Sequence, residues 1–161
     1  DKYLDEVPWP VHHRPIEEPL ARLQERMQKV SLDPIALEKA RIGAAANLTK
    51  LYAAGAGRDT LDARFSKVAA WARDRGISPR RILIGEFGVL RKNGDSPGAL
   101  CEDRIRWLSD IREIMDKYGF SWSYFSYDGP FALVRSDQDR EFDLSVLKAL
   151  GLRNGKTGCE S

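Results

Sequence analysis

The order of apolar patterns along the chain constrains its fold most strongly. Apolar residues recur at helical spacing along 31–57, 58–77, 99–119 and 143–152. Short apolar or aromatic runs at 81–86 and 120–129 alternate with them. This alternation predicts α/β units with parallel strands. Two strands alone do not make a self-sufficient parallel sheet, because both faces and both edges need covering. We therefore expect the chain either to assemble with more sheet or to be part of a larger barrel.

Local signals indicate where the helices begin and end. Asp33 can cap the first helix, and Pro34 suits its first position. Gly76 and Gly119 suit the positions that end the second and third helices. Residues 1–20 carry four prolines without a helical or strand period, so we expect an irregular covering segment there.

Composition excludes some classes of function. The 161 residues are enough for one domain of ordinary size. The formal net charge of +2 is small and its basic residues are interspersed with acids, so we expect no nucleic acid as partner. No apolar run approaches the roughly 20 residues of a membrane span. No CxxC motif or Cys/His cluster accompanies Cys101 and Cys159, so we expect no structural zinc site. Because Cys159 lies in a polar tail, we expect free thiols rather than a disulfide.

Glu86 in "RILIGEFGVL" follows an apolar run at the carboxyl end of the first expected strand. Functional groups of α/β proteins gather at such strand ends. The flanking Gly85 and Gly88 would permit unusual backbone angles and close approach of a ligand. A carboxylate there can be a general base, a nucleophile or a metal ligand. The alternative is that Glu86 only pairs with an arginine of a neighbouring strand, and spacing leaves both open.

The second expected strand, "FSWSYFSYDG", is rich in aromatic residues and ends in Asp128. Aromatic faces stack on the apolar faces of pyranose rings, and neighbouring carboxylates can bond sugar oxygens. Packing alone also favours aromatic residues in strands. Alternation places Trp122 and Tyr124 on the face opposite Phe125, so at most half of the set can line a site.

Two stretches together resemble a known family. "ILIGEFGVL" and "RIRWLSDIREIMDKYGFSWSYFSYDGPFAL" resemble the C-terminal part of glycoside hydrolase family 5, the cellulase family of (β/α)8 barrels. In that family the seventh strand ends in a GEFG-like motif, an R-x-x-W helix follows (here Arg104 and Trp107), and the eighth strand carries a W-x-x-W-like motif. The opening "YLDEVPWP" also resembles the loop after the sixth strand.

The resemblance implies an α/β fold that is the C-terminal part of a (β/α)8 TIM barrel, about strands seven and eight with flanking helices. It assigns residues 1–151 to this catalytic barrel, and we expect residues 152–161 to form a flexible C-terminal tail. Glu86 would be the nucleophile of a retaining β-glycosidase, an endoglucanase-like enzyme that hydrolyses β-glucan through a glycosyl–Glu86 intermediate. The family's acid/base glutamate has no counterpart in these residues, so it would come from the N-terminal part of the same barrel. The isolated chain should then be inactive.

The resemblance also implies a substrate site and a location. Its expected substrate-binding residues are Phe125, Trp122, Tyr127, Asp128 and Trp9, where Phe125 replaces the family's second tryptophan. Packing under the loop is the alternative for Trp9. The mechanism calls for no metal and no cofactor, the partner would be a β-glucan polysaccharide or oligosaccharide, and the location would be secreted or periplasmic.

Two other functions and several other acids are alternatives to this expectation. One rival is a non-catalytic carbohydrate-binding or interaction module derived from the same fold, and another is an unrelated α/β enzyme that uses Glu86 as a base. Four further acids offer no persuasive second carboxylate: Glu17 and Glu18 would lie in a proline-bounded loop, and Glu102 and Asp103 would complement a helix dipole. The adjacent His12 and His13 are expected to be solvated.

Overall fold

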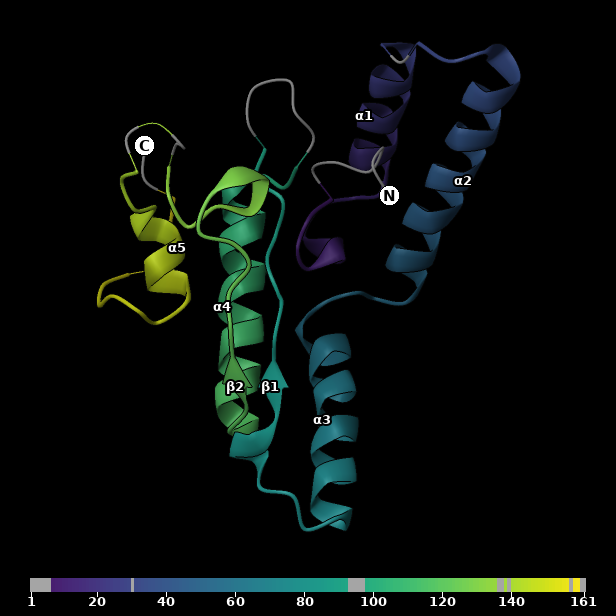
Figure 1. The fold of residues 1–161 in the computed structure, drawn as a ribbon. Coiled ribbons are helices and arrows are strands. Elements are labelled where there is room, and N and C mark those ends of the chain that lie inside the picture. The colour runs from purple at the N-terminus through teal and green to yellow at the C-terminus, as the bar shows by residue number, and fades with distance from the viewer. Residues whose placement is uncertain are drawn as a thin grey trace.

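The computed structural model describes residues 7–29, 31–92, 98–135, 138, 140–156, 158 and 159. Figure 1 shows its helices and strands, which are α1 (Glu17–Gln28), α2 (Pro34–Ala53), α3 (Arg58–Asp74), β1 (Leu83–Ile84), α4 (Cys101–Tyr118), β2 (Ser121–Trp122) and α5 (Leu144–Ala149). Short 3-10 turns lie at Val11–His13, Pro79–Arg81 and Gly129–Phe131.

The two strands form the parallel pair that the sequence predicts. Leu83 lies opposite Ser121 and Ile84 opposite Trp122, and α4 connects β1 to β2. The resulting β-α-β unit confirms an α/β arrangement with parallel strands. Both strands are much shorter than expected, because within the described residues each has only one neighbour to complete its ladder. That they are strands seven and eight of a barrel stays a prediction.

Helices α3 and α4 lie on one side of this strand pair, and α5 packs on α4. The core beneath them consists of Phe87, Ile105, Leu108, Ile111, Met115, Phe120, Val146, Ala149 and Leu150. Leu108, Ile111 and Met115 of α4 belong to it, which confirms the apolar helix face. On the opposite side of the strands, Leu83 is 63% exposed in the described structure. One face of the pair is therefore packed and the other is open.

Helices α1 and α2 pack against each other away from the strands (Figure 1). A small core of Leu23, Met27 and Ala44 joins them. The start of α2 follows the expected capping, since Asp33 Oδ1 accepts from the N–H groups of Ile35 (3.1 Å) and Ala36 (3.0 Å).

Helix α1 corrects the expectation that residues 1–20 are irregular, because it begins at Glu17. Pro19 occupies the first turn, where backbone N–H groups have no intrahelical partner and proline is tolerated. Leu23 and Met27 are buried one turn apart on the same face. The four-residue spacing of Leu23 and Met27 favours a helix, but the prolines before it led to the expectation of a loop.

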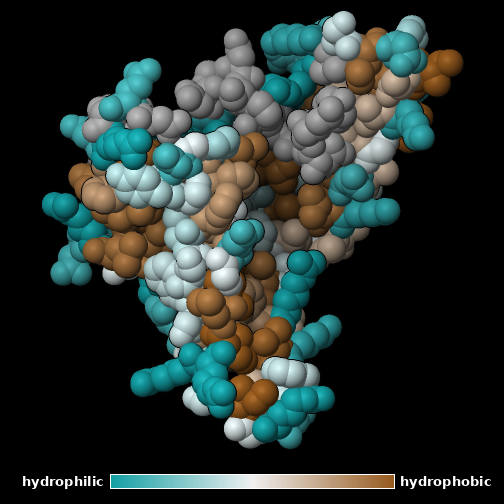
Figure 2. All heavy atoms as spheres, viewed as in Figure 1, coloured by the Kyte–Doolittle hydropathy of each residue, from teal (hydrophilic) through white to brown (hydrophobic). Residues whose placement is uncertain are grey.

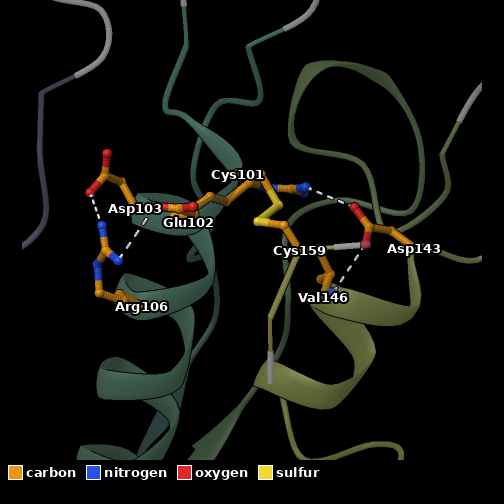
Figure 3. The surroundings of a disulfide bond; sticks show 8 residues. Cys101, Glu102, Asp103, Arg106, Asp143, Val146 and Cys159 are labelled. Carbon is orange, nitrogen blue, oxygen red and sulfur yellow. Dashed lines mark hydrogen bonds and ion pairs between the residues drawn. A yellow bond between two sulfur atoms is a disulfide. The ribbon is translucent and has the colours of Figure 1, made fainter. Parts of the chain in front are cut away.

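A disulfide joins Cys101, the first residue of α4, to Cys159 near the end of the chain (Figure 3). The expectation of free thiols is therefore wrong. Their Cα atoms lie 6.0 Å apart, within the usual range for a disulfide. Composition of the tail was a poor guide, because the pairing depends on where the tail folds. The bond anchors one point of the tail, and its flexibility elsewhere and the boundary at residue 151 stay predictions.

Within the described ranges, the helices are all too short or too polar to be candidates for crossing a membrane.

Candidate functional site

An extra residue enters the ladder between the strands just before or at Glu86. On the β2 side the donating amides advance in steps of two: Ser121 to the carbonyl of Ile82 (2.9 Å), Ser123 to that of Ile84 (3.0 Å) and Phe125 to that of Phe87 (2.9 Å). The acceptors therefore advance by two residues and then by three. Such a bulge reverses which side chains face the core, and bulges occur often beside functional sites.

This bulge decides where Glu86 lies. Strict alternation from Ile82 and Ile84 would turn Glu86 toward the helices and Phe87 away from them. Instead Phe87 is 7% exposed in the core, where Ile82 and Ile84 also pack, and Glu86 is exposed. No hydrogen bond or ion pair joins Glu86 to another described residue. Within the described chain Glu86 is therefore not held by an arginine, which was the structural alternative.

The aromatic residues of the second strand divide as alternation predicts. The Trp122 ring packs edge-to-face on Phe87 at a centroid distance of 5.5 Å, and Tyr124 does so at 5.6 Å. Both residues pack against the core below the helices. Phe125 is 44% exposed, and its ring contacts that of Phe131 at 5.6 Å. The placement of Trp122 favours packing, whereas Phe125 presents a ring to solvent.

Tyr127 and Asp128 follow on the exposed side of this chain segment. Tyr127 contacts the Phe142 ring at 6.3 Å, and the Arg140 guanidinium lies 5.8 Å from the centre of the Tyr127 ring. Asp128 is exposed, and its backbone carbonyl accepts a hydrogen bond from the Ser126 hydroxyl (2.5 Å). The peptide bond between Phe125 and Ser126 is cis. Both predicted residues remain accessible at the carboxyl end of β2.

Trp9 is anchored against α4. Its indole N–H donates to Asp110 (2.8 Å), and its ring meets that of Trp107 edge-to-face at 6.4 Å. Trp9 also borders a recess of about 400 Å³, whose apolar lining includes Leu51 and Val89. Figure 2 shows apolar side chains around the hollow between the α1–α2 pair and the rest of the chain. These contacts favour the packing alternative for Trp9, and a place on the rim of a substrate cleft stays a prediction.

Asp103 is a buried acceptor, which sequence reasoning missed. Its Oδ1 accepts from the Trp9 backbone N–H (2.9 Å) and from Arg106 Nη2 (2.6 Å), and its Oδ2 accepts from Arg14. Figure 3 shows the contact with Arg106. Complementing the helix dipole is therefore only part of the role of Asp103. Glu102 beside it is exposed, which agrees with a role limited to the dipole.

Among the other polar residues, Glu17 and Glu18 require a correction, whereas His12 and His13 are exposed as expected. Glu17 and Glu18 open helix α1 rather than lying in a loop, and both are exposed. His12 is exposed but its ring also packs edge-to-face on Tyr52 at 5.6 Å. Among the described residues, no three His, Cys, Asp or Glu side chains gather in a way that could hold a metal ion.

Arg104, which the sequence showed only as part of a motif, lies on α4 and is buried behind Tyr124 and Phe131. It is 2% exposed and pairs with Asp143 (3.2 Å). Its Nη2 also contacts the Tyr124 hydroxyl (3.1 Å), and that hydroxyl donates to the carbonyl of Phe131 (2.7 Å). Burial raises the pKa of Tyr124, an effect that the charge of Arg104 opposes. The helix-facing side of β2 is thus tied to the loop that follows it.

The fold and the site define an α/β unit with an exposed glutamate at a strand end, and the C-terminal part of the chain is related in sequence to the endoglucanases, a class of glycoside hydrolase. The relative is Endoglucanase 3 of Fibrobacter succinogenes, 26% identical over 106 residues. This match confirms the resemblance to glycoside hydrolase family 5. It covers 66% of this chain and only 14% of that protein. No protein-family model matches the chain.

Solved structures give weaker likenesses. The cellulose synthase subunit Z (CcsZ) of Clostridioides difficile is 30% identical with a TM-score of 0.49, covering 58% of this chain and 28% of that one. Thermotoga maritima Cel5A, solved in complex with mannotriose, is 29% identical with a TM-score of 0.48, covering 58% and 27%. Likenesses with TM-scores below 0.5 do not define the fold, so the sequence match alone carries the relationship.

Proposed function

We propose that the chain is part of a retaining β-glucanase of the endoglucanase type and that Glu86 is its nucleophile. The observation that carries the proposal is the bulge, which turns Glu86 out of the core at the carboxyl end of a parallel strand. The exposed ring of Phe125 lies at the same level of the ladder, one hydrogen bond from the neighbouring Phe87. The segment that holds both belongs to the part of the chain related to an endoglucanase.

The chemistry requires a second carboxyl group. In the first step Glu86 attacks the anomeric carbon while an acid protonates the leaving oxygen, and in the second step water, activated by the same group as a base, releases the sugar. The two carboxyl groups must lie about 5–5.5 Å apart. We assign the acid/base role to another part of the same barrel, outside these 161 residues. The 161 residues alone should then be inactive.

The strand pair supports a larger sheet. Each strand has one neighbour in the described structure, and Leu83 is exposed on the face without helices. Further strands of a (β/α)8 barrel would complete the ladders and cover this face. We therefore propose that residues 1–151 supply about strands seven and eight of such a barrel and that its N-terminal part is the main partner of this surface.

The proposed substrate is a β-glucan or an oligosaccharide derived from it. Phe125 offers a face for stacking on a pyranose ring, although with less area than an indole and without its N–H. Tyr127 and Asp128 offer polar atoms nearby. Trp122 and Trp9 are engaged in packing, so the proposal rests on Phe125, Tyr127 and Asp128, and sugar contacts of Trp122 and Trp9 stay predictions. We also propose a secreted or periplasmic location, which the disulfide supports because such bonds persist in oxidising compartments.

Hydrolysis by a polypeptide that contains the complete barrel tests the proposal. Glu86→Gln should lower kcat on a soluble β-glucan by at least about a thousandfold, since the nucleophile is lost. Glu102→Gln, at an exposed carboxylate of α4, is the matched control and should leave kcat unchanged. Full activity of Glu86→Gln would exclude this role. Glu86-dependent hydrolysis by the 161 residues alone would overturn the need for a second carboxylate from elsewhere.

A non-catalytic carbohydrate-binding module is the second candidate. The exposed rings of Phe125 and Tyr127 favour it, because they could hold a sugar without any reaction. Glycan binding that survives Glu86→Gln but not Phe125→Ala, in a protein without hydrolytic activity, would support this candidate against the enzyme.

A further inference from the structure

Two arginines bind the backbone carbonyls of residues 130–135, the segment that follows the proposed sugar-binding loop. Arg104 Nη2 donates to the carbonyls of Phe131 (3.1 Å) and Ala132 (2.6 Å). From the β1 side, Arg91 Nη1 donates to the carbonyls of Val134 (3.0 Å) and Arg135 (2.6 Å). The Arg91 backbone N–H also donates to the carbonyl of Pro130 (2.9 Å). The 130–135 segment is thus held from two directions.

The burial of Arg104 indicates that these bonds matter. A guanidinium at 2% exposure is destabilising unless its charge is paired and its donors are used. Asp143 supplies the opposite charge through Nη1, and Nη2 donates to the carbonyls of Phe131 and Ala132, whereas the buried Nε has no hydrogen-bond partner among the described residues. The planar fork of arginine can reach several acceptors at once, whereas the single ammonium of lysine cannot reproduce this geometry. Arg104 therefore fixes backbone rather than only filling space.

The held segment in turn contacts the proposed site. The Leu133 N–H donates to the carbonyls of Ser126 (2.9 Å) and Tyr127 (3.0 Å). The Phe131 ring packs on the Phe125 ring, and the Tyr124 hydroxyl binds the Phe131 carbonyl. A shift of the 130–135 segment would therefore displace Phe125 and the loop of residues 126–128.

We propose that Arg91 and Arg104 are positioning residues for glucan binding. They hold Phe125 and residues 126–128 in place through the 130–135 segment and do not touch the sugar themselves. This inference rests on the proposed function, because it takes Phe125 as the stacking surface. Preorganisation of this kind affects affinity strongly, since a displacement of about 1 Å in a binding group can lower catalytic efficiency about 100-fold.

Affinity for cellotetraose, measured by calorimetry, tests the inference without requiring hydrolysis. The parent is Glu86→Gln in the polypeptide with the complete barrel, and the variants added to it are Arg91→Lys, Arg104→Lys and Tyr124→Phe. We expect each to weaken binding, on the order of tenfold for the arginines and less for Tyr124→Phe, which removes only one hydroxyl. Arg112→Lys, on the same helix and paired with Asp116 (2.8 Å), is the control and should bind as the parent does.

The outcomes separate the two proposals. If the parent binds no cellotetraose and the unmodified enzyme hydrolyses no β-glucan, the proposed function fails and this inference fails with it. If the parent binds but folded Arg91→Lys and Tyr124→Phe bind equally well, only the positioning role fails. A merely structural role would lower the melting temperature and the fraction of binding-competent protein, while the dissociation constant of that fraction stayed unchanged. Arg91→Lys and Tyr124→Phe keep the test decisive if Arg104→Lys does not fold.

Discussion

Gly88 lies directly against the backbone carbonyl of Phe125, so that a Cβ atom at residue 88 would overlap the carbonyl oxygen. Gly85, on the other side of Glu86, has open space where its Cβ would be. Neither glycine adopts left-handed backbone angles, so the expectation that both permit unusual angles is wrong. Only Gly88 is required by close approach, and what approaches it is the neighbouring strand end.

This asymmetry predicts different effects of alanine at the two glycines. Gly88→Ala forces the Phe125 carbonyl to move and should lower the free energy of unfolding by about 1–3 kcal/mol. Gly85→Ala should change it by less than about 0.5 kcal/mol. Urea unfolding of both variants measures the difference, and equal losses of stability would contradict the close approach.

The disulfide predicts a dependence on reducing agent. It closes a loop across a sequence separation of 58 residues, and removing such a bond typically lowers stability by about 2–4 kcal/mol. Native protein should show no reactive thiol before reduction, and Cys101→Ser with Cys159→Ser should unfold at the same temperature with or without reductant. Two thiols that react in the oxidised native protein would show that the bond is absent.

We expect substitution of Asp103 to lower the free energy of unfolding more than substitution of the adjacent Glu102. Asp103→Ala leaves the Trp9 N–H, Arg14 and Arg106 without their shared acceptor. We expect the free energy of unfolding to fall by about 3 kcal/mol, because the lost carboxylate is buried. The loss is not larger because both arginines are partly exposed and can bind water instead. Glu102→Ala removes an exposed carboxylate and should change stability by less than about 0.5 kcal/mol. Chemical denaturation of the pair decides, and similar losses would rule out an anchoring role for Asp103.

The raised pKa of Tyr124 predicts that the free energy of unfolding falls at alkaline pH. Its pKa in the folded protein is raised, chiefly by burial, whereas an unfolded tyrosine titrates near 10. Above about pH 10 the unfolded chain therefore binds fewer protons than the folded one, and stability falls as pH rises. Below that pH the contribution is fully present. Tyr124→Phe should make the alkaline decline of the unfolding free energy shallower, and an unchanged slope would contradict the buried hydroxyl.

Local signals sufficed for the helices that begin and end at capping residues. Asp33 caps α2 through its carboxylate, and Gly76 and Gly119 adopt the left-handed angles expected just beyond α3 and α4. Helix α1 was missed because its prolines resembled loop signals, although Pro19 lies in the first turn. Such features depend on neighbours within a few residues and are visible in the sequence.

The site was predictable only in part, because its remaining features depend on distant partners. Period-two alternation correctly separated exposed Phe125 from packed Trp122. The bulge before Phe87 follows from pairing with another strand, which no local pattern encodes. Arg91 and Asp103 bind groups 43 and 94 residues away, so their partners could not be inferred from spacing.

Covalent labelling tests the central claim most directly. A 2-deoxy-2-fluoro-cellobioside with an activated leaving group, incubated with a polypeptide that contains the complete barrel, should trap a glycosyl-enzyme intermediate. We predict one label per active protein, located by peptide mass spectrometry on Glu86, and no label in Glu86→Gln. A label on another residue, or none in a protein that hydrolyses β-glucan with retention of configuration, would contradict the assignment of Glu86 as the nucleophile.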